Sequence, residues 1–109
     1  MVDIIKTISG SGRGTYVRRK AISSTQAIMI LNANPNRVSL TIEAPTGNTG
    51  NIAIAFNDPA VAVTGDHQGT LVAPGGQFIE SAPANGGALF IISANGTEDA
   101  LVREDFGVV

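Results

Sequence analysis

Cysteine and tryptophan are absent from this chain of 109 residues, and charged residues make up only 15% of it. Without cysteine the chain has neither a disulfide framework nor a thiolate metal site. Typical domains carry about 25% charged residues, and a freely diffusing monomer normally has a charged surface. Since 43% of the residues are hydrophobic, the composition favours a chain whose surface is partly covered by partner subunits. A neutral but soluble β domain fits the same composition.

Long hydrophobic runs are also missing. No run is longer than that at residues 27–31, which is far short of the ~20 apolar residues that cross a bilayer. Residues 1–6 include Asp3, where a secretory signal would carry positive charge. The sequence therefore predicts no membrane partner. It also predicts that the protein is made in the cytoplasm and stays in the cell that makes it.

Catalytic motifs are scarce. His67 is the only histidine and lies in a loop-like segment, and no Gly-x-Ser-x-Gly elbow presents a serine. Residues 10–14 approach a phosphate-binding pattern, but strand-like residues follow where a helix would have to begin. We therefore predict that the chain is not an enzyme, with no catalytic residue and no cofactor.

The acidic residues include two adjacent doublets, Glu98-Asp99 and Glu104-Asp105, and the single residues Asp58, Asp66 and Glu80. Neighbouring residues of a strand point to opposite faces, so a doublet is not by itself a carboxylate pair. We predict a solvated acidic surface and no metal. A Ca²⁺ site built from loop oxygens is the alternative.

Charge is distributed unevenly along the chain. The first twenty residues hold five cations and one acid, a net charge of +4, and the remainder holds two cations and eight acids, a net charge of −6. Complementary patches of this kind steer association and fix its register, which favours packing between neighbouring copies. A nucleic-acid arm is disfavoured, because Tyr16 is the only aromatic residue near the cations. A solvated basic strand edge is a further interpretation.

Alternating hydrophobicity predicts strands along most of the chain. The clearest is residues 37–43, where Val38, Leu40 and Ile42 share one face and Arg37 falls on the other. Residues 51–56 place small alanines on their second face, which predicts that another segment packs closely there. Residues 25–31 and 88–94 are apolar on both faces, as expected for central strands or strands under an interface. The remaining expected strands cover residues 15–22, 69–73, 77–81 and 100–104.

Turn residues separate these segments, and no stretch has a capped 3.6-residue period. Short strands at such intervals predict an all-β fold, namely an antiparallel β-sandwich or a jelly-roll-like small barrel, formed as a single domain over residues 15–109. Residues 1–14 are expected to form a flexible N-terminal arm, because an apolar cluster is followed by a run of glycine and serine.

The apolar termini and the basic segment are the candidate partner-contact elements. An exchanged arm ties protomers together at low cost, although free termini also fray. The candidate contact residues are Ile4, Ile5, Ile8, Arg13, Arg18, Arg19, Phe106 and Val108.

Residues 34–42, the strand 52–56, the segments 69–71 and 74–76, and the closing strand 100–104 resemble small β proteins of tailed bacteriophage particles. Many of those proteins are capsid decoration, cement or minor head proteins. The resemblance covers roughly residues 26–104 and lies in the succession of strands and turns. It implies a jelly-roll or sandwich fold, oligomers on a shell and no enzyme activity.

Two functions follow as expectations. The first is a structural protein of a virus particle, assembled in the host cytoplasm, which binds and stabilises neighbouring shell subunits and forms homo-oligomers. Its partners would be the major capsid protein or other virion proteins. The alternative is a ligand- or glycan-binding β module of a tail or host-attachment component, using the loops at residues 46–51 and 66–68. The scarcity of aromatic side chains disfavours that alternative.

Overall fold

The computed structural model describes residues 3–8, 13–81, 84–95 and 98–107. Nine strands and no helix occur within these ranges. The strands are β1 (Asp3–Ile8), β2 (Arg13–Ile22), β3 (Ile28–Leu31), β4 (Arg37–Glu43), β5 (Ile52–Phe56), β6 (Thr70–Val72), β7 (Gln77–Glu80), β8 (Leu89–Ser93) and β9 (Glu98–Gly107). All eight strands expected from the alternation are present, and their ends differ from the expected ends by a few residues.

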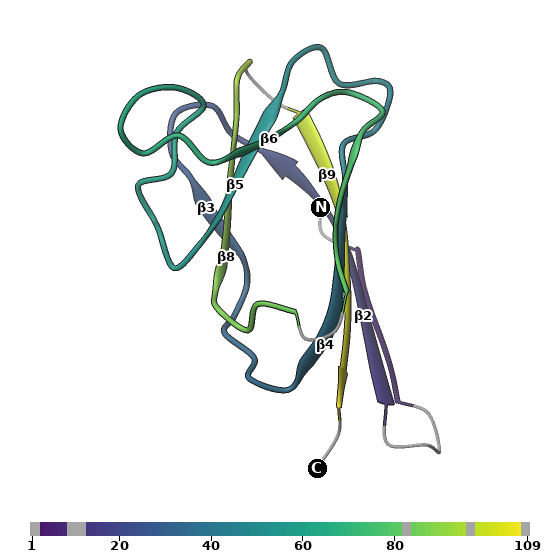
Figure 1. The fold of residues 1–109 in the computed structure, drawn as a ribbon. Coiled ribbons are helices and arrows are strands. Elements are labelled where there is room, and N and C mark those ends of the chain that lie inside the picture. The colour runs from purple at the N-terminus through teal and green to yellow at the C-terminus, as the bar shows by residue number, and fades with distance from the viewer. Residues whose placement is uncertain (1–2, 9–12, 82–83, 96–97, 108–109) are drawn as a thin grey trace.

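The strands form two antiparallel sheets that face each other (Figure 1). Sheet A has the order β1-β2-β9-β4-β7, and sheet B has the order β3-β8-β5-β6. Apart from β1, successive strands cross between the sheets except from β5 to β6, as in a double-sheet jelly roll. The all-β sandwich fold predicted from the sequence is therefore confirmed. Four strands, β1 and β7 in sheet A and β3 and β6 in sheet B, lie at sheet edges.

The core lies between the sheets and is aliphatic. Leu40 and Ile42 of β4 face Ile52 of β5, and all three side chains are fully buried. They occupy alternate positions of their strands, because successive side chains of a strand point to opposite faces. Burial of this apolar surface is the main stabilising term, at roughly 25 cal/mol per Å².

The outer face of sheet B is partly covered by the loop that joins β5 to β6. Val61 of this loop is 2% exposed and packs against Ala53 and Ile92, which lie on that outer face. Alanine leaves the space that the valine side chain fills. The close packing that the small second face of residues 51–56 predicted is confirmed.

The N-terminal segment differs from the flexible arm expected for residues 1–14. Residues 3–8 form β1, the edge strand of sheet A, in register with β2 from Asp3 opposite Arg19 to Ile8 opposite Gly14. The run of glycine and serine at residues 9–12 lies outside the described residues. The expectation treated the apolar cluster as unable to fold alone, but antiparallel pairing with β2 satisfies its backbone groups on one side.

Arg37 also differs from its expected position. The alternation placed it on the solvent face of its strand, but it is 4% exposed and lies among buried groups. The reason is a register irregularity against β9, where Arg37 pairs with Phe106 and Ser39 pairs with Asp105. Moving two residues along β4 therefore moves the pairing by only one residue along β9. Such a β-bulge changes the direction of the side chain at its position, here that of Arg37.

Asp105 links three strands on the outer face of sheet A. Thr15 of β2 donates a hydrogen bond of 2.8 Å to one carboxylate oxygen, and Ser39 of β4 donates one of 2.9 Å to the other. Partial burial opposes ionisation of Asp105, but the hydrogen bonds from Thr15 and Ser39 and the charge of Arg103 outweigh it. The pKa of Asp105 is therefore held below its ordinary value of 3.8.

We expect Asp105→Asn to lower the free energy of unfolding by about 1 kcal/mol at neutral pH, because two charge-assisted hydrogen bonds weaken at a partly exposed site. A lowered folded-state pKa stabilises the fold above the unfolded pKa, and this contribution is lost as the pH falls through the folded pKa. Urea unfolding at about pH 7 and about pH 3 should therefore show the difference from wild type shrinking in acid. A constant difference at both pH values would contradict this assignment.

Candidate functional site

The candidate contact residues gather at one edge of sheet A. Ile4, Ile5 and Ile8 lie on β1, and Arg13, Arg18 and Arg19 lie on β2 beside it. Phe106 lies near the end of β9, where its register neighbour Gly14 belongs to β2. Val108 lies outside the described residues. The structure thus brings the apolar cluster and the basic segment onto one hairpin, which the sequence treated as an arm and a separate strand.

Two of these residues have described side-chain partners. The guanidinium of Arg19 lies 2.8 Å from a carboxylate oxygen of Asp99, and both side chains are largely exposed. The ring of Phe106 lies over Gly14, since a Cβ atom placed on that glycine would be 2.4 Å from the ring. The C-terminal aromatic residue is therefore packed against the start of β2, and its position requires glycine there.

A first groove opens between the edge of β3 and the facing strands β2 and β9. Its volume is about 260 Å³, and it is lined by the segment from Met29 to Asn34 together with Tyr16, Glu104 and Phe106. Met29 is 47% exposed at the rim. The groove adjoins the hairpin that carries the candidate contact residues, because Tyr16 and Gly14 belong to β2 and pair with β1.

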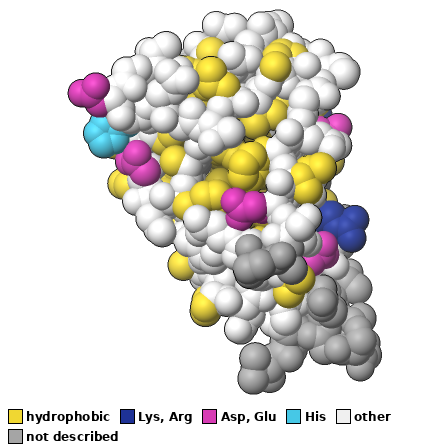
Figure 2. Space-filling model, viewed as in Figure 1, with side chains coloured by type: hydrophobic (Ala, Val, Ile, Leu, Met, Phe, Trp, Pro, Cys, Tyr) yellow, Lys and Arg dark blue, Asp and Glu magenta, His cyan; other side chains and the backbone are white. Residues whose placement is uncertain are grey.

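A second groove opens at the opposite side of the sandwich, between β5 and β6 of sheet B and β7 of sheet A. Its volume is about 460 Å³, and its lining includes Phe56, Phe78, Thr70 and Asn85. The two phenylalanine rings lie 6.5 Å apart in a tilted arrangement. In the view of Figure 2, hydrophobic side chains show between the two layers with acidic side chains close by. The seam at this side is therefore open, and it is lined by two phenylalanine rings together with polar groups.

Large hydrophobic side chains are exposed on edge strands. Met29 of β3 is 47% exposed, Leu71 of β6 is 41% exposed and Ile79 of β7 is 61% exposed. A single exposed apolar residue is common on a protein surface. These three lie on strands at the edges of the two sheets, and natural proteins usually protect such edges with charge or proline.

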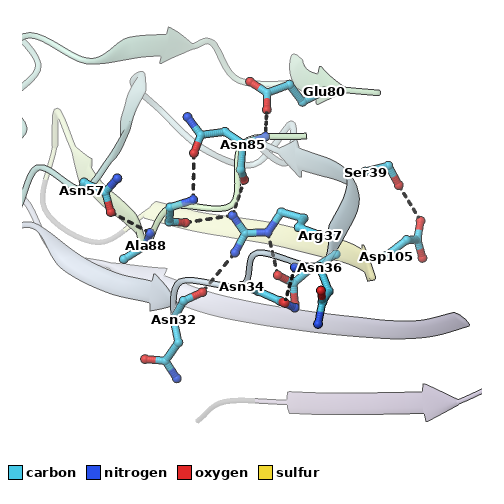
Figure 3. A network of polar contacts seen from close by, with 12 residues as sticks. Asn32, Asn34, Asn36, Arg37, Ser39, Asn57, Glu80, Asn85, Ala88 and Asp105 are labelled. Atoms are coloured by element: carbon cyan, nitrogen blue, oxygen red, sulfur yellow. Dashed lines mark hydrogen bonds and ion pairs between the residues drawn. The ribbon is translucent and has the colours of Figure 1, made fainter. Parts of the chain in front are cut away.

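Arg37 is the centre of a polar network at one end of the sandwich, which the sequence did not indicate (Figure 3). Its Nε donates a hydrogen bond of 2.6 Å to Glu104. The remaining nitrogens donate to the backbone carbonyls of Asn85 (2.6 Å), Gly87 (2.8 Å) and Asn32 (3.1 Å). The network joins β4 and β9 to the loops that follow β3 and β7. A lone arginine in a strand pattern gives no signal of such a role, because Glu104, Asn85 and Gly87 are distant in sequence.

A second polar cluster holds the loop between β4 and β5. The buried carboxylate of Glu98 accepts hydrogen bonds from the backbone N–H groups of Thr49 (2.9 Å) and Gly50 (2.6 Å). The Asn48 side chain exchanges two hydrogen bonds with the backbone of Asp99. The loop at residues 46–51, which the glycan alternative required, therefore directs several polar groups inward.

The acid doublets separate onto opposite faces, as the sequence analysis predicted. Glu98 and Glu104 are each 5% exposed and face inward, while Asp99 and Asp105 are more accessible. Within the described ranges, no three histidine, aspartate or glutamate side chains cluster as metal ligands. The same part of the chain forms no helix with the length and apolarity to cross a bilayer.

His67 lies on the surface of the loop between β5 and β6. Its Nδ1 is 3.2 Å from a carboxylate oxygen of Asp58. The hydrogen bond with His67 is the main cause that holds the pKa of Asp58 below its ordinary value. Among the described residues, no serine or threonine hydroxyl is hydrogen-bonded to this histidine, so the pair lacks the nucleophile of a Ser–His–acid arrangement.

We expect Arg37→Met to lower the free energy of unfolding by about 3–5 kcal/mol, because Glu104 would remain buried without its cation. The Arg37 side chain is fully buried, and that of Glu104 is 7% exposed. The double variant with Glu104→Met should recover part of this loss, since it removes the uncompensated charge. Urea unfolding of the wild type, the two single variants and the double variant measures the coupling. Additive losses would exclude a coupled pair.

No protein family and no curated protein matches this sequence. Among solved structures, the chain is similar to a protein of the Bacillus endospore appendages, which form a family of disulfide-linked pili (TM-score 0.54, 17% identity, covering 96% of this chain and 92% of that one). It is less similar to a cupin superfamily protein from Desulfitobacterium hafniense (TM-score 0.43, 10% identity, covering 100% and 79%). A proposed mannose-6-phosphate isomerase from Ralstonia eutropha has a TM-score of 0.46 at 9% identity, covering 100% of this chain and 86% of that one. At these identities the likeness concerns the fold alone.

Proposed function

We propose that this chain is a non-enzymatic structural subunit of a larger assembly, built into it by contacts along the edges of its two sheets. The observation that carries the proposal is the position of the exposed hydrophobic residues Met29, Leu71 and Ile79, each on an edge strand. Main-chain pairing at a sheet edge supplies affinity, and side chains beside that edge supply specificity.

The composition of sheet B supports this proposal. Its four strands, β3, β8, β5 and β6, contain no Asp, Glu, Lys or Arg. A charged residue on an edge strand is a common protection against unwanted pairing. Sheet B has no such protection at either edge, which is a hazard for a monomer and is consistent with a subunit whose edges are covered by neighbours.

A virus particle is the assembly that we favour. The succession of strands and turns over residues 26–104 resembles small β proteins of tailed bacteriophage particles, whose members bind neighbouring shell subunits. In that setting the subunit would be assembled in the host cytoplasm, beside the major capsid protein or another virion protein. The β1–β2 hairpin, which forms one edge of sheet A and carries isoleucines and arginines, supplies a further contact element.

A filament is the second candidate, favoured by the similarity to the protein of the Bacillus appendages. That family consists of disulfide-linked pili, whereas this chain contains no cysteine. A filament of this chain would therefore depend on edge contacts and apolar burial alone.

We expect the purified chain to form species well above its monomer mass of 11.2 kDa, measured by light scattering coupled to size exclusion over a range of concentrations. Ile79→Lys should shift the distribution towards monomer, because it places a charge on the most exposed apolar edge residue. Thr64→Lys adds the same charge to an exposed loop position and should leave the distribution unchanged. A wild type that stays monomeric at every concentration would contradict the proposal.

A further inference from the structure

The cations of this protein are concentrated at one edge of sheet A. The sequence contains no Lys or Arg from Val38 to Val102. Arg37 is buried against Glu104, and Arg103 lies 3.7 Å from Asp105 in the middle of the sheet. The remaining five cations are on β1 and β2, namely Lys6, Arg13, Arg18, Arg19 and Lys20.

The opposite edge of sheet A carries acids. Glu80 lies on β7, and Glu43 lies at the end of β4, where its register neighbour is Gln77 of β7. Sheet A therefore has a basic edge at β1–β2 and an acidic edge at β7, separated by the width of the sheet.

The acidic edge also carries exposed apolar surface. The second groove opens there, between β5, β6 and β7. The carboxylate of Glu80 accepts a hydrogen bond from the backbone N–H of Asn85, a residue that lines this groove, which places the acid at its rim. Ile79 and Leu71 are exposed on the two strands that flank the groove. The β1–β2 hairpin has the matching composition, since its five cations accompany Ile4, Ile5 and Ile8.

We propose that the β1–β2 hairpin of one copy packs against the β6–β7 side of a second copy, with its basic residues next to Glu43 and Glu80 and its isoleucines over the second groove, which holds Phe56 and Phe78. This inference rests on the proposed function and names the partner, a second copy of the same chain. The two patches lie at opposite edges of one sheet, so the contact is heterologous and each copy both offers a hairpin and accepts one. A two-fold contact between identical edges would instead bring like charges together, which disfavours association.

A reciprocal charge exchange tests this contact. Variant one carries Glu43→Lys and Glu80→Lys, so both of its edges are basic. Variant two carries Lys6→Glu and Arg18→Glu, so both of its edges are acidic or nearly neutral. We expect each variant alone to need at least about tenfold higher concentration than wild type for half-assembly, equivalent to about 1.4 kcal/mol. An equimolar mixture should associate again at least into pairs, because the basic hairpin of variant one then meets the acidic β7 edge of variant two.

Light scattering and sedimentation measure the assembly, and the urea denaturation slope confirms that both variants are folded. Asp66→Lys reverses a charge on the exposed β5–β6 loop and should assemble as wild type does. Raising the salt concentration should weaken the wild-type contact, since exposed charges are screened.

The outcomes separate this inference from the proposed function. If the wild type assembles and both charge variants assemble equally well alone, the hairpin contact is wrong and the structural role stands. If the variants are monomeric and their mixture also stays monomeric, the two edges do not meet, and the inference is again overturned. If the wild type itself is monomeric throughout, both proposals fall.

Discussion

The physical constraint on which this structure depends is the burial of a sheet that has no charged residue. Both faces of sheet B are apolar and need to be covered. One face packs on sheet A through an aliphatic core that includes Ile52 and Leu89. The other face is only partly covered by the β5–β6 loop, with Val61 packed on Ala53. Met29 and Leu71 remain exposed beside the covered region. Apolar area left in contact with water forgoes the stabilisation that burial provides, so a neighbour that covers it gains that free energy.

The buried polar groups act within the fold. Arg37 and Glu98 are almost completely buried, and each is hydrogen-bonded to backbone groups of loops at the ends of the strands. Buried backbone groups in loops need hydrogen-bond partners outside the sheet, and a buried charged side chain can bond to several of them at once. The loops are therefore closed against the sandwich by internal contacts.

The sequence predicted the strands well because alternation is a local property. Residues 37–43 and 51–56 have a period of two, and the structure places β4 and β5 there with their aliphatic side chains in the core. The small second face of β5 even indicated the covering loop. These predictions need only the rule that neighbouring side chains point to opposite faces.

The misplaced features depend on contacts between distant segments. Arg37 is buried because of a bulge against β9, and nothing in the local pattern marks a bulge. The segment at residues 3–8 is a strand because β2 is available to pair with it. The grooves were not predicted, since they arise where edge strands of two different sheets stand apart. The charge asymmetry was visible in the sequence, but only the sheet order shows that it runs from one edge to the other.

The sheet order also determines which assemblies the edges permit. Four antiparallel steps separate β1 from β7, so these two strands run in the same direction. A second copy shifted along the sheet, with the same face outward, would bring β7 beside β1 in parallel. A two-fold rotation that keeps the same face outward would bring identical edges together in antiparallel fashion, the pairing that is slightly more stable per residue. Hydrogen-bond geometry alone would thus favour a closed dimer. The opposite charges of the two edges favour the shifted arrangement, in which every copy leaves one edge open for the next, as a shell or filament requires.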